Sequence, residues 1–199
     1  MLSLSLSGSA IADFQREHTD HLGVRLLDDG KIGKKTQWAL DLSLHSVPRQ
    51  QIIARALGFV GTCESPPLSN RSPTIDIFTR RCGALGLPWC AAFVSWCISL
   101  PGYPEIKEAS VQRLSKLLPN VTEPLPADVV YYLHSDGTGH CGLLLGSELG
   151  SLMTVEGNNN GAVRVVTRQG DQVKFLRSVA PTQMPGIPPG LPFGGNVTR

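Results

Sequence analysis

The sequence predicts an α+β protein in which helices come first and an antiparallel sheet follows. Before Pro124, apolar residues recur at the three-and-four spacing of helix faces. From Pro124 onward, short strand-like segments follow at close intervals, separated by glycine and asparagine. Helices followed by strands are typical of an antiparallel sheet with helices packed on one side.

Composition limits the classes of function. The chain has 199 residues, of which 41% are hydrophobic and 17% charged, which suits one medium domain with a small accessory unit. A net charge of +2 gives no basic field for nucleic acid or a membrane surface. No apolar run approaches the roughly 20 residues of a membrane span. The five cysteines form no CxxC pair, so we expect no metal and no cofactor.

Residues 1–46 predict a small helical module. The alternating start, MLSLSLSGSA, fits a short strand or a flexible arm better than a signal peptide. The rest predicts a helix, turns at Asp29-Gly30 and at Gly33, and a second helix that carries Trp38. Thr36 is the predicted N-cap of that second helix.

Residues 47–180 predict the main domain, and residues 181–199 a tail. Pro48 fits the first turn of a helix, TIDIFTRRCGALG predicts a helix that ends at glycine, and Gly86–Cys97 leads into a third helix. The segments ADVVYYL, HCGLLLG, LMTVEG and AVRVVTR predict strands, with QVKFLRSV a further candidate. The Pro- and Gly-rich tail predicts an extended or disordered segment.

Cys90 is the candidate nucleophile. Pro88 favours a helix start, which places Cys90 in the first turn, where free N–H groups and the helix dipole stabilise a thiolate. Cys97 follows two turns later and should be a buried spacer. By spacing alone, an interpretation of both cysteines as core residues is equally good.

His140 is the candidate base. It enters a predicted strand in TGHCG, between glycines that allow another group to approach closely. The rival His134 lies in a polar loop and is expected to be solvated. By strand alternation, Cys141 should point away from the cleft.

The segment VEGNNNG supplies a candidate third group. Glu156 ends a predicted strand, and Asn158 shares its face two positions on, so both side chains should reach the same imidazole. A carboxylate on the far ring nitrogen fixes the tautomer and stabilises the imidazolium. Asn159 and Asn160 are expected to form a plain turn.

These motifs together resemble one enzyme family. In order, PWCAAFVSWC, PADVVYY, GHCGLLLG and TVEGNNNG are similar to the CHAP family, the cysteine, histidine-dependent amidohydrolases/peptidases of bacterial and phage cell-wall hydrolases. The resemblance runs from about Ile52 to Val179. It implies a papain-like fold, with a nucleophile at Cys90, a base at His140, an orienting Glu156 and an assisting Asn158. Trp89, next to the nucleophile, is a candidate substrate-binding residue.

The N-terminal module has a resemblance of its own. FQREH…DDGKIGKKTQWAL is similar to the peptidoglycan-binding repeat of bacterial hydrolases. This resemblance implies that Asp29, Gly30 and Thr36 belong to a binding surface for the wall. The alternative is a helical pair that only packs on the main domain.

The resulting expectation is a peptidoglycan hydrolase in which the Cys90 thiolate attacks a wall amide. The scissile bond is either inside the stem peptide, which we slightly favour, or the amide between the sugar lactyl group and L-alanine. The backbone N–H of Cys90 is the expected oxyanion donor. The alternatives are a wall-binding protein without catalysis and an acyltransferase that uses the same triad.

The site of action follows from this chemistry. Without a clear signal peptide, the protein is expected to be made in the cytoplasm and to act on the cell wall, in the periplasm. A phage endolysin reaches the wall through a pore, and an antibacterial effector is injected into a rival cell. An effector would require an immunity protein as partner, one that plugs the Cys90 cleft.

Overall fold

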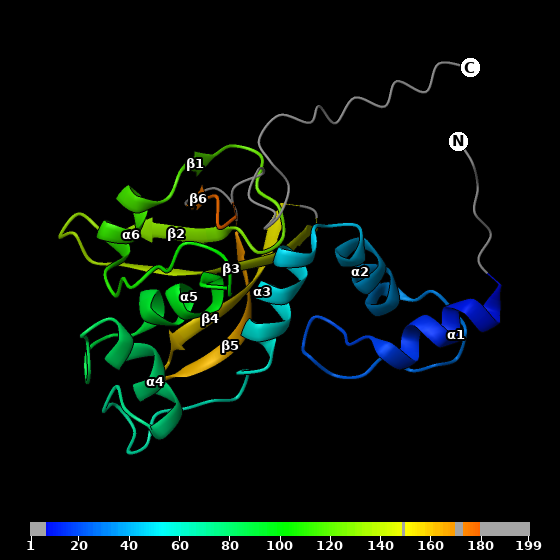
Figure 1. The fold of residues 1–199 in the computed structure, drawn as a ribbon, viewed down its shortest axis with the longest axis horizontal. Coiled ribbons are helices and arrows are strands. Elements are labelled where there is room, and N and C mark those ends of the chain that lie inside the picture. Colours follow the sequence, from blue (N-terminus) through cyan, green and yellow to red (C-terminus); the bar gives the residue numbers. More distant parts are fainter. Residues whose placement is uncertain (1–6, 149, 170–172, 180–199) are drawn as a thin grey trace.

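The computed structural model describes residues 7–148, 150–169 and 173–179, and within them the predicted α+β class is confirmed (Figure 1). The helices are α1 (Gly8–Glu17), α2 (Lys34–Ser43), α3 (Val47–Leu57), α4 (Pro73–Arg81), α5 (Cys90–Ile98) and α6 (Val111–Leu117). The strands are β1 (Asn120–Val121), β2 (Val129–Leu133), β3 (Gly139–Glu148), β4 (Ser151–Asn159), β5 (Ala162–Gln169) and β6 (Lys174–Leu176).

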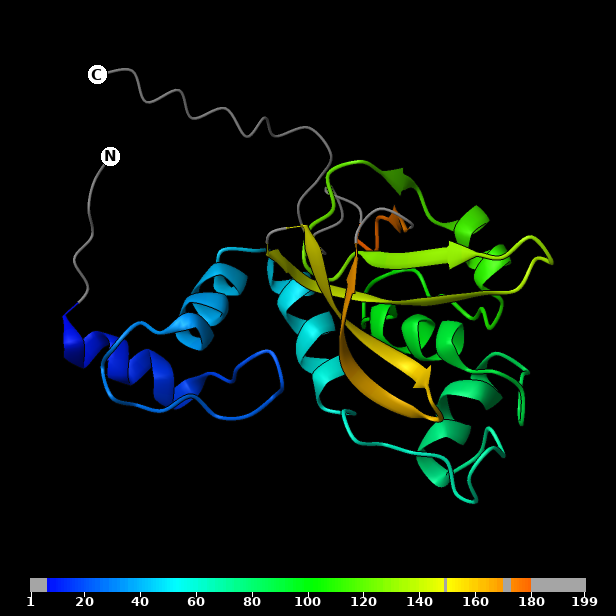
Figure 2. The same cartoon turned by 180° about the vertical axis from the view of Figure 1, so that it is seen from behind.

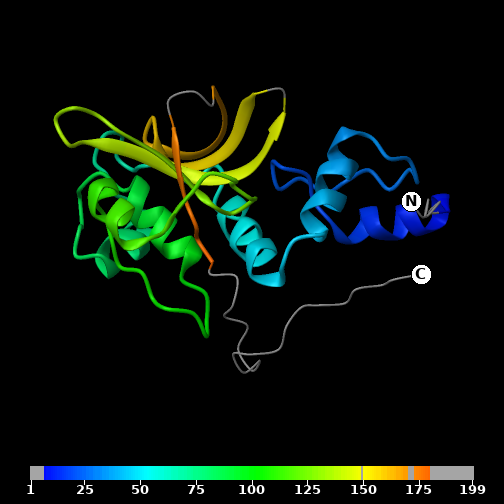
Figure 3. The same ribbon diagram turned by 90° about the horizontal axis from the view of Figure 1, so that it is seen from above.

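The strands form one antiparallel sheet in the order β1-β6-β2-β3-β4-β5. Seen from above, helices α3 to α6 lie beneath the sheet, so one face is covered (Figure 3). Alternate residues of β3 confirm this division. Cys141, Leu143 and Leu145 belong to the main core with α5, whereas Leu144 belongs to a smaller cluster with Val130 on β2.

Helix α5 is the centre of the core. Its sequence, CAAFVSWCI, is apolar on every side, and all its residues except Trp96 are buried. A helix that is apolar all round needs partners all round, and α5 packs on β3, β4 and the helices α3, α4 and α6. Cys97 is fully buried, as predicted, and burial raises the pKa of its thiol far above the ordinary value.

The N-terminal helices α1 and α2 lie beside the sheet rather than beneath it (Figures 1 and 2). A hydrogen bond of 3.0 Å from Trp38 Nε1 to the carbonyl oxygen of Leu145 ties α2 to β3. A cavity of about 1070 Å³ lies between α2 and the sheet, lined by Trp38, Leu144, Met153 and Thr167 among others. The module therefore docks on the sheet through few direct contacts.

Local predictions met different outcomes. Pro48 lies in the first turn of α3, and α4 is followed by Gly83 with a left-handed φ of 65°, both as predicted. Thr36 is not the N-cap of α2, because Gly33 occupies that position and the helix already begins at Lys34. Helix α6 and strand β1 are additions to the prediction.

Some predictions fall on residues outside the described ranges. The tail at residues 181–199 is among these, and so are residues 1–6 of the alternating start. The described part of that start does not form the expected strand or arm, because α1 already begins at Gly8. Among the described residues, no helix has both the length and the apolar character that crossing a bilayer demands.

Candidate active site

Cys90 is the first residue of α5, and Trp89 is its N-cap. Pro88 therefore precedes the helix instead of occupying its first turn. The Cys90 side chain is almost buried, with 5% of the residue exposed. The first N–H groups of a helix have no intrahelical acceptor, so the start of α5 offers both donors and a positive dipole end to this sulfur.

His140 lies at the start of β3, opposite Tyr132 on β2. The β3–β4 register ends at the Leu143–Val155 pair, so His140 lies beyond the last paired residue of β3 on that side. There the His140 side chain lies beside the Cys90 thiol, close enough for each group to shift the pKa of the other. The rival His134 is exposed, as predicted for a polar loop.

The negative charge on Cys90 and the positive charge on His140 stabilise each other. Hydrogen bonds from Cys141 and then His140 lower the pKa of Cys90 to about 5, although burial opposes the change. Burial alone would lower the pKa of His140, but its bonds to Cys90 and Glu156 raise the pKa to about 9. Between about pH 5 and pH 9 the site therefore holds a thiolate beside an imidazolium.

Glu156 on β4 is the third member of the chain of contacts. Its Oε2 lies 2.8 Å from His140 Nε2, and only 1% of the residue is exposed. Thr154 Oγ1 donates to Oε1 at 2.8 Å, and Asn159 Nδ2 donates to Oε2 at 2.8 Å. Arg168 on β5 donates its Nε to Oε1 and its Nη2 to Oε2, the latter at 2.5 Å.

These partners keep Glu156 ionised. Burial would raise the pKa of its carboxyl, but the bonds from Arg168, His140 and Asn159 hold that pKa far below the ordinary range. Gly142 on β3 makes room for this side chain. A Cβ at Gly142 would stand 2.6 Å from Glu156 Cγ, which confirms that a glycine beside His140 permits close approach.

Asn158 does not join this group, contrary to the prediction. Its φ of 57° is left-handed, and the β4–β5 register shifts between Glu156 and Asn159, so the expected alternation of faces is broken there. The Asn158 amide instead lies 3.5 Å from Asn70 Oδ1. Asn159, expected to be a plain turn residue, takes the place beside Glu156.

Cys141 also departs from the expectation. Its thiol does not point away from the cleft but lies beside Cys90, and the two thiols shift each other's pKa, that of Cys90 downward and that of Cys141 upward. Cys141 lies on the core face of β3 together with α5, and Cys90 is the first residue of α5, so this neighbour of His140 is within reach of the nucleophile as well. All five cysteines are free thiols.

Trp89 is unavailable to a substrate in this structure, contrary to its predicted binding role. The residue is 0% exposed, and its Nε1 donates to Glu64 Oε1 at 3.1 Å. Its ring packs near Phe78, with centroids 6.4 Å apart. Trp89 therefore anchors the start of α5 from within the core.

Asp29, Gly30 and Thr36 gather around one buried side chain, Gln15. Gln15 Nε2 donates to Asp29 Oδ1 at 3.2 Å and to Thr36 Oγ1 at 3.1 Å, and the Gly30 N–H donates to Gln15 Oε1 at 2.9 Å. Gly30 has a left-handed φ of 70°. These motif residues hold the module's own turn to its helices, and their role in binding the wall stays a prediction.

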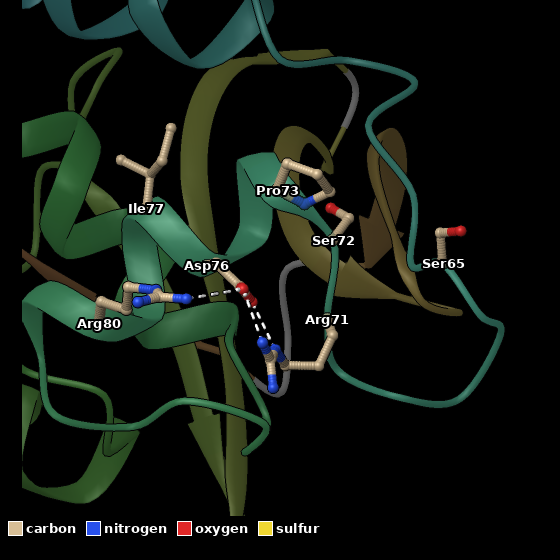
Figure 4. Close-up of a pocket in the computed structure, with 7 residues that line it drawn as sticks. All are labelled: Ser65, Arg71, Ser72, Pro73, Asp76, Ile77 and Arg80. Atoms are coloured by element: carbon tan, nitrogen blue, oxygen red, sulfur yellow. Dashed lines mark hydrogen bonds and ion pairs between the residues drawn. The ribbon is translucent and has the colours of Figure 1, made fainter.

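A separate cavity of about 540 Å³ lies at the start of α4 (Figure 4). Arg71 and Arg80 both turn toward Asp76 in this view. Arg71 donates to both carboxylate oxygens, at 2.6 and 2.8 Å, and Arg80 lies 3.6 Å away. Asp76 thus pairs with both cations, and Cys90 is not among the residues that line this cavity. Among the described residues, no cluster of three or more His, Cys, Asp or Glu is placed to hold a metal ion.

Sequence reasoning missed Arg168, Thr154 and Asn159. Thr154 had a usable signal, because it lies two residues before Glu156 and so on the same face of β4. No signal in the sequence pointed to Arg168, because its direct partner on β4 is Leu152. Its side chain contacts Glu156 diagonally across the sheet. The direct partner of Glu156 is Arg164, which bonds elsewhere.

Comparison with protein-family models and with curated proteins finds no match for this chain. The resemblance to the CHAP family therefore rests on the sequence motifs alone.

Proposed function

We propose that this protein is a cysteine-dependent peptidoglycan hydrolase with a papain-like, CHAP-type catalytic domain. The observation that carries the proposal is the continuous chain from the Cys90 sulfur through His140 to the Glu156 carboxylate, which lies 2.8 Å from the imidazole. A nucleophile, a base and a group that orients the base are the parts of a catalytic triad, whatever the order of the residues along the chain.

The geometry supports acyl transfer to water. The Cys90 thiolate attacks the carbonyl carbon of an amide, and the N–H at the start of α5 stabilises the resulting oxyanion. The imidazolium of His140 gives its proton to the leaving amine as the C–N bond breaks. Neutral His140 then takes a proton from water, whose oxygen attacks the thioester and releases Cys90. Because the Glu156 carboxylate holds Nε2 of His140, Nδ1 is the ring nitrogen left to exchange a proton with Cys90.

The motif resemblance supplies the substrate class. It supports a peptide bond of the cell wall, with endopeptidase activity slightly favoured over cleavage between the lactyl group and L-alanine. The N-terminal module is proposed to hold the wall polymer, and the protein to act in the periplasm as a phage endolysin or an injected effector. In the second case an immunity protein would cover Cys90.

Digestion of purified sacculi tests the proposal. The wild type should release fragments whose masses identify the broken bond, and Cys90→Ala should release none. Cys97→Ala is the matched control, because it removes a buried thiol of the same helix that lies outside the site, and it should retain turnover. Circular dichroism confirms that each variant is folded.

Other outcomes would replace the proposal. Equal release by a folded Cys90→Ala protein would exclude the cysteine mechanism. Incorporation of a labelled amine in place of water would identify an acyltransferase. Binding of sacculi by the wild type without any release of fragments would identify a wall-binding protein that is not a hydrolase.

A further inference from the structure

Four neighbouring strands each place one side chain in a single cluster beside Cys90. β2 contributes Tyr132, β3 contributes His140, β4 contributes Glu156 and β5 contributes Arg168. The catalytic roles proposed above use His140 and Glu156 but leave Arg168 without a task.

Arg168 is held on two sides. Its guanidinium donates through Nε and Nη2 to the two oxygens of Glu156, a forked arrangement that a lysine cannot reproduce. Its Cζ stands 5.6 Å from the centroid of the Tyr132 ring, within the range of a cation–π contact. The side chain is 27% exposed, so most of it is inside the protein. The contacts with Glu156 and Tyr132 therefore fix the position of the Arg168 guanidinium.

A buried carboxylate beside an imidazole creates a chemical difficulty. An uncompensated negative charge 2.8 Å from His140 Nε2 would stabilise the imidazolium strongly. His140 must nevertheless release its proton to the leaving amine, and a proton donor works best when its pKa is not far above the working pH. A positive charge on the far side of the carboxylate weakens its hold on that proton.

We infer that Arg168 is a positioning residue that fixes the Glu156 carboxylate and, by cancelling part of its charge, limits the proton affinity of His140. The inference rests on the proposed function, because it assigns His140 the role of proton donor. The charged and titratable groups around His140 are few. Cys90 and Cys141 face the site from α5 and β3, Glu156 from β4 and Tyr132 from β2, and Arg168 acts through Glu156.

Alkylation of Cys90 by iodoacetamide, followed against pH, tests this without a wall substrate. The rate reports the thiolate, and its two steps report Cys90 and His140, expected near pH 5 and pH 9 in the wild type. Modification is read at Cys90 by peptide mass spectrometry that distinguishes it from Cys82 and Cys97. Arg168→Gln removes the charge and keeps a donor, Arg168→Lys keeps the charge, and Arg113→Gln removes an arginine from another forked pair with a glutamate.

The expected result is an upper step about one pH unit higher in Arg168→Gln, the scale of shift that one neighbouring charge produces. Arg168→Lys should stay near the wild type in this step, and Arg113→Gln should match it. An unmoved or lowered upper step in folded Arg168→Gln would overturn the inference. A wild type without two steps would instead show that Cys90 and His140 do not form an ion pair, which contradicts the proposed function itself.

Discussion

Two buried polar networks hold this protein together, and they differ in where they end. In the N-terminal module, Gln15 satisfies Asp29, Gly30 and Thr36, and all partners are groups of the module itself. In the sheet, Glu156 is bound by equally many groups, but one of them is His140, which goes on to a thiol.

The difference teaches how to separate a structural motif from a chemical one. The Gln15 network is neutral at its centre and closes on itself, so its hydrogen bonds specify a fold. The Glu156 network concentrates an anion, a histidine and a thiolate whose pKa values are moved in opposite directions. Such opposed shifts are characteristic of acid–base assignments in active sites.

Glu156→Gln should give the largest effect of any change within the two networks. Loss of the charge that orients and stabilises the imidazolium is worth roughly four orders of magnitude in rate. That corresponds to about 5.4 kcal/mol of transition-state stabilisation, at about 1.36 kcal/mol per factor of ten. Turnover of one defined muropeptide measures the effect, with substrate affinity expected to change little. A loss smaller than about tenfold would mean that Glu156 is structural, like Gln15.

Gln15→Ala should show the opposite pattern, with stability lost and chemistry kept. Truncation leaves buried groups of the module without partners, at a cost of about 1–3 kcal/mol in the free energy of unfolding of the module. Urea denaturation measures this cost. Turnover of a small soluble muropeptide should remain within about twofold of the wild type. Unchanged stability together with lost turnover would erase the distinction between the networks.

The two asparagines of the β4–β5 turn give the smallest and sharpest test. Asn159→Ala removes a hydrogen bond to a charged carboxylate, worth about 1.5 kcal/mol, so turnover should fall roughly tenfold. Asn158→Ala removes only a long contact with Asn70 and should leave turnover nearly unchanged. If Asn158→Ala is the more damaging variant, the asparagine is acting on His140, and the Asn159 contact is incidental.

Much of the site could be predicted because it rests on local rules. The helix start at Cys90, the strand entry at His140 and the strand position of Glu156 follow from residue types and periodicity. The predictions that failed depend on backbone conformation and on the register between strands. Asn158 has a left-handed φ, so Asn159 and not Asn158 donates to Glu156. Arg168, and not the directly paired Arg164, contacts Glu156 diagonally across the sheet.

The predictions of Trp89 as a binding residue and of Thr36 as a helix cap failed for a different reason. Trp89 lies next to the nucleophile in sequence, but adjacent residues at a helix start point in different directions, and its indole is buried against Glu64. Thr36 was predicted as a cap because threonine favours that position, but Gly33 is the N-cap of α2, and Thr36 accepts a hydrogen bond from Gln15. Burial of a single side chain is decided by tertiary packing, which these local patterns do not specify.

Trapping of the acyl-enzyme tests the central claim most directly. The protein is mixed with a defined muropeptide, quenched in acid within the first turnover, and analysed by intact and peptide mass spectrometry. The account predicts an acyl group in thioester linkage on Cys90, formed together with the released amine fragment and absent from Cys90→Ala. Release of the same fragment with Cys90 unmodified at every time point, and continued release by Cys90→Ala, would contradict it.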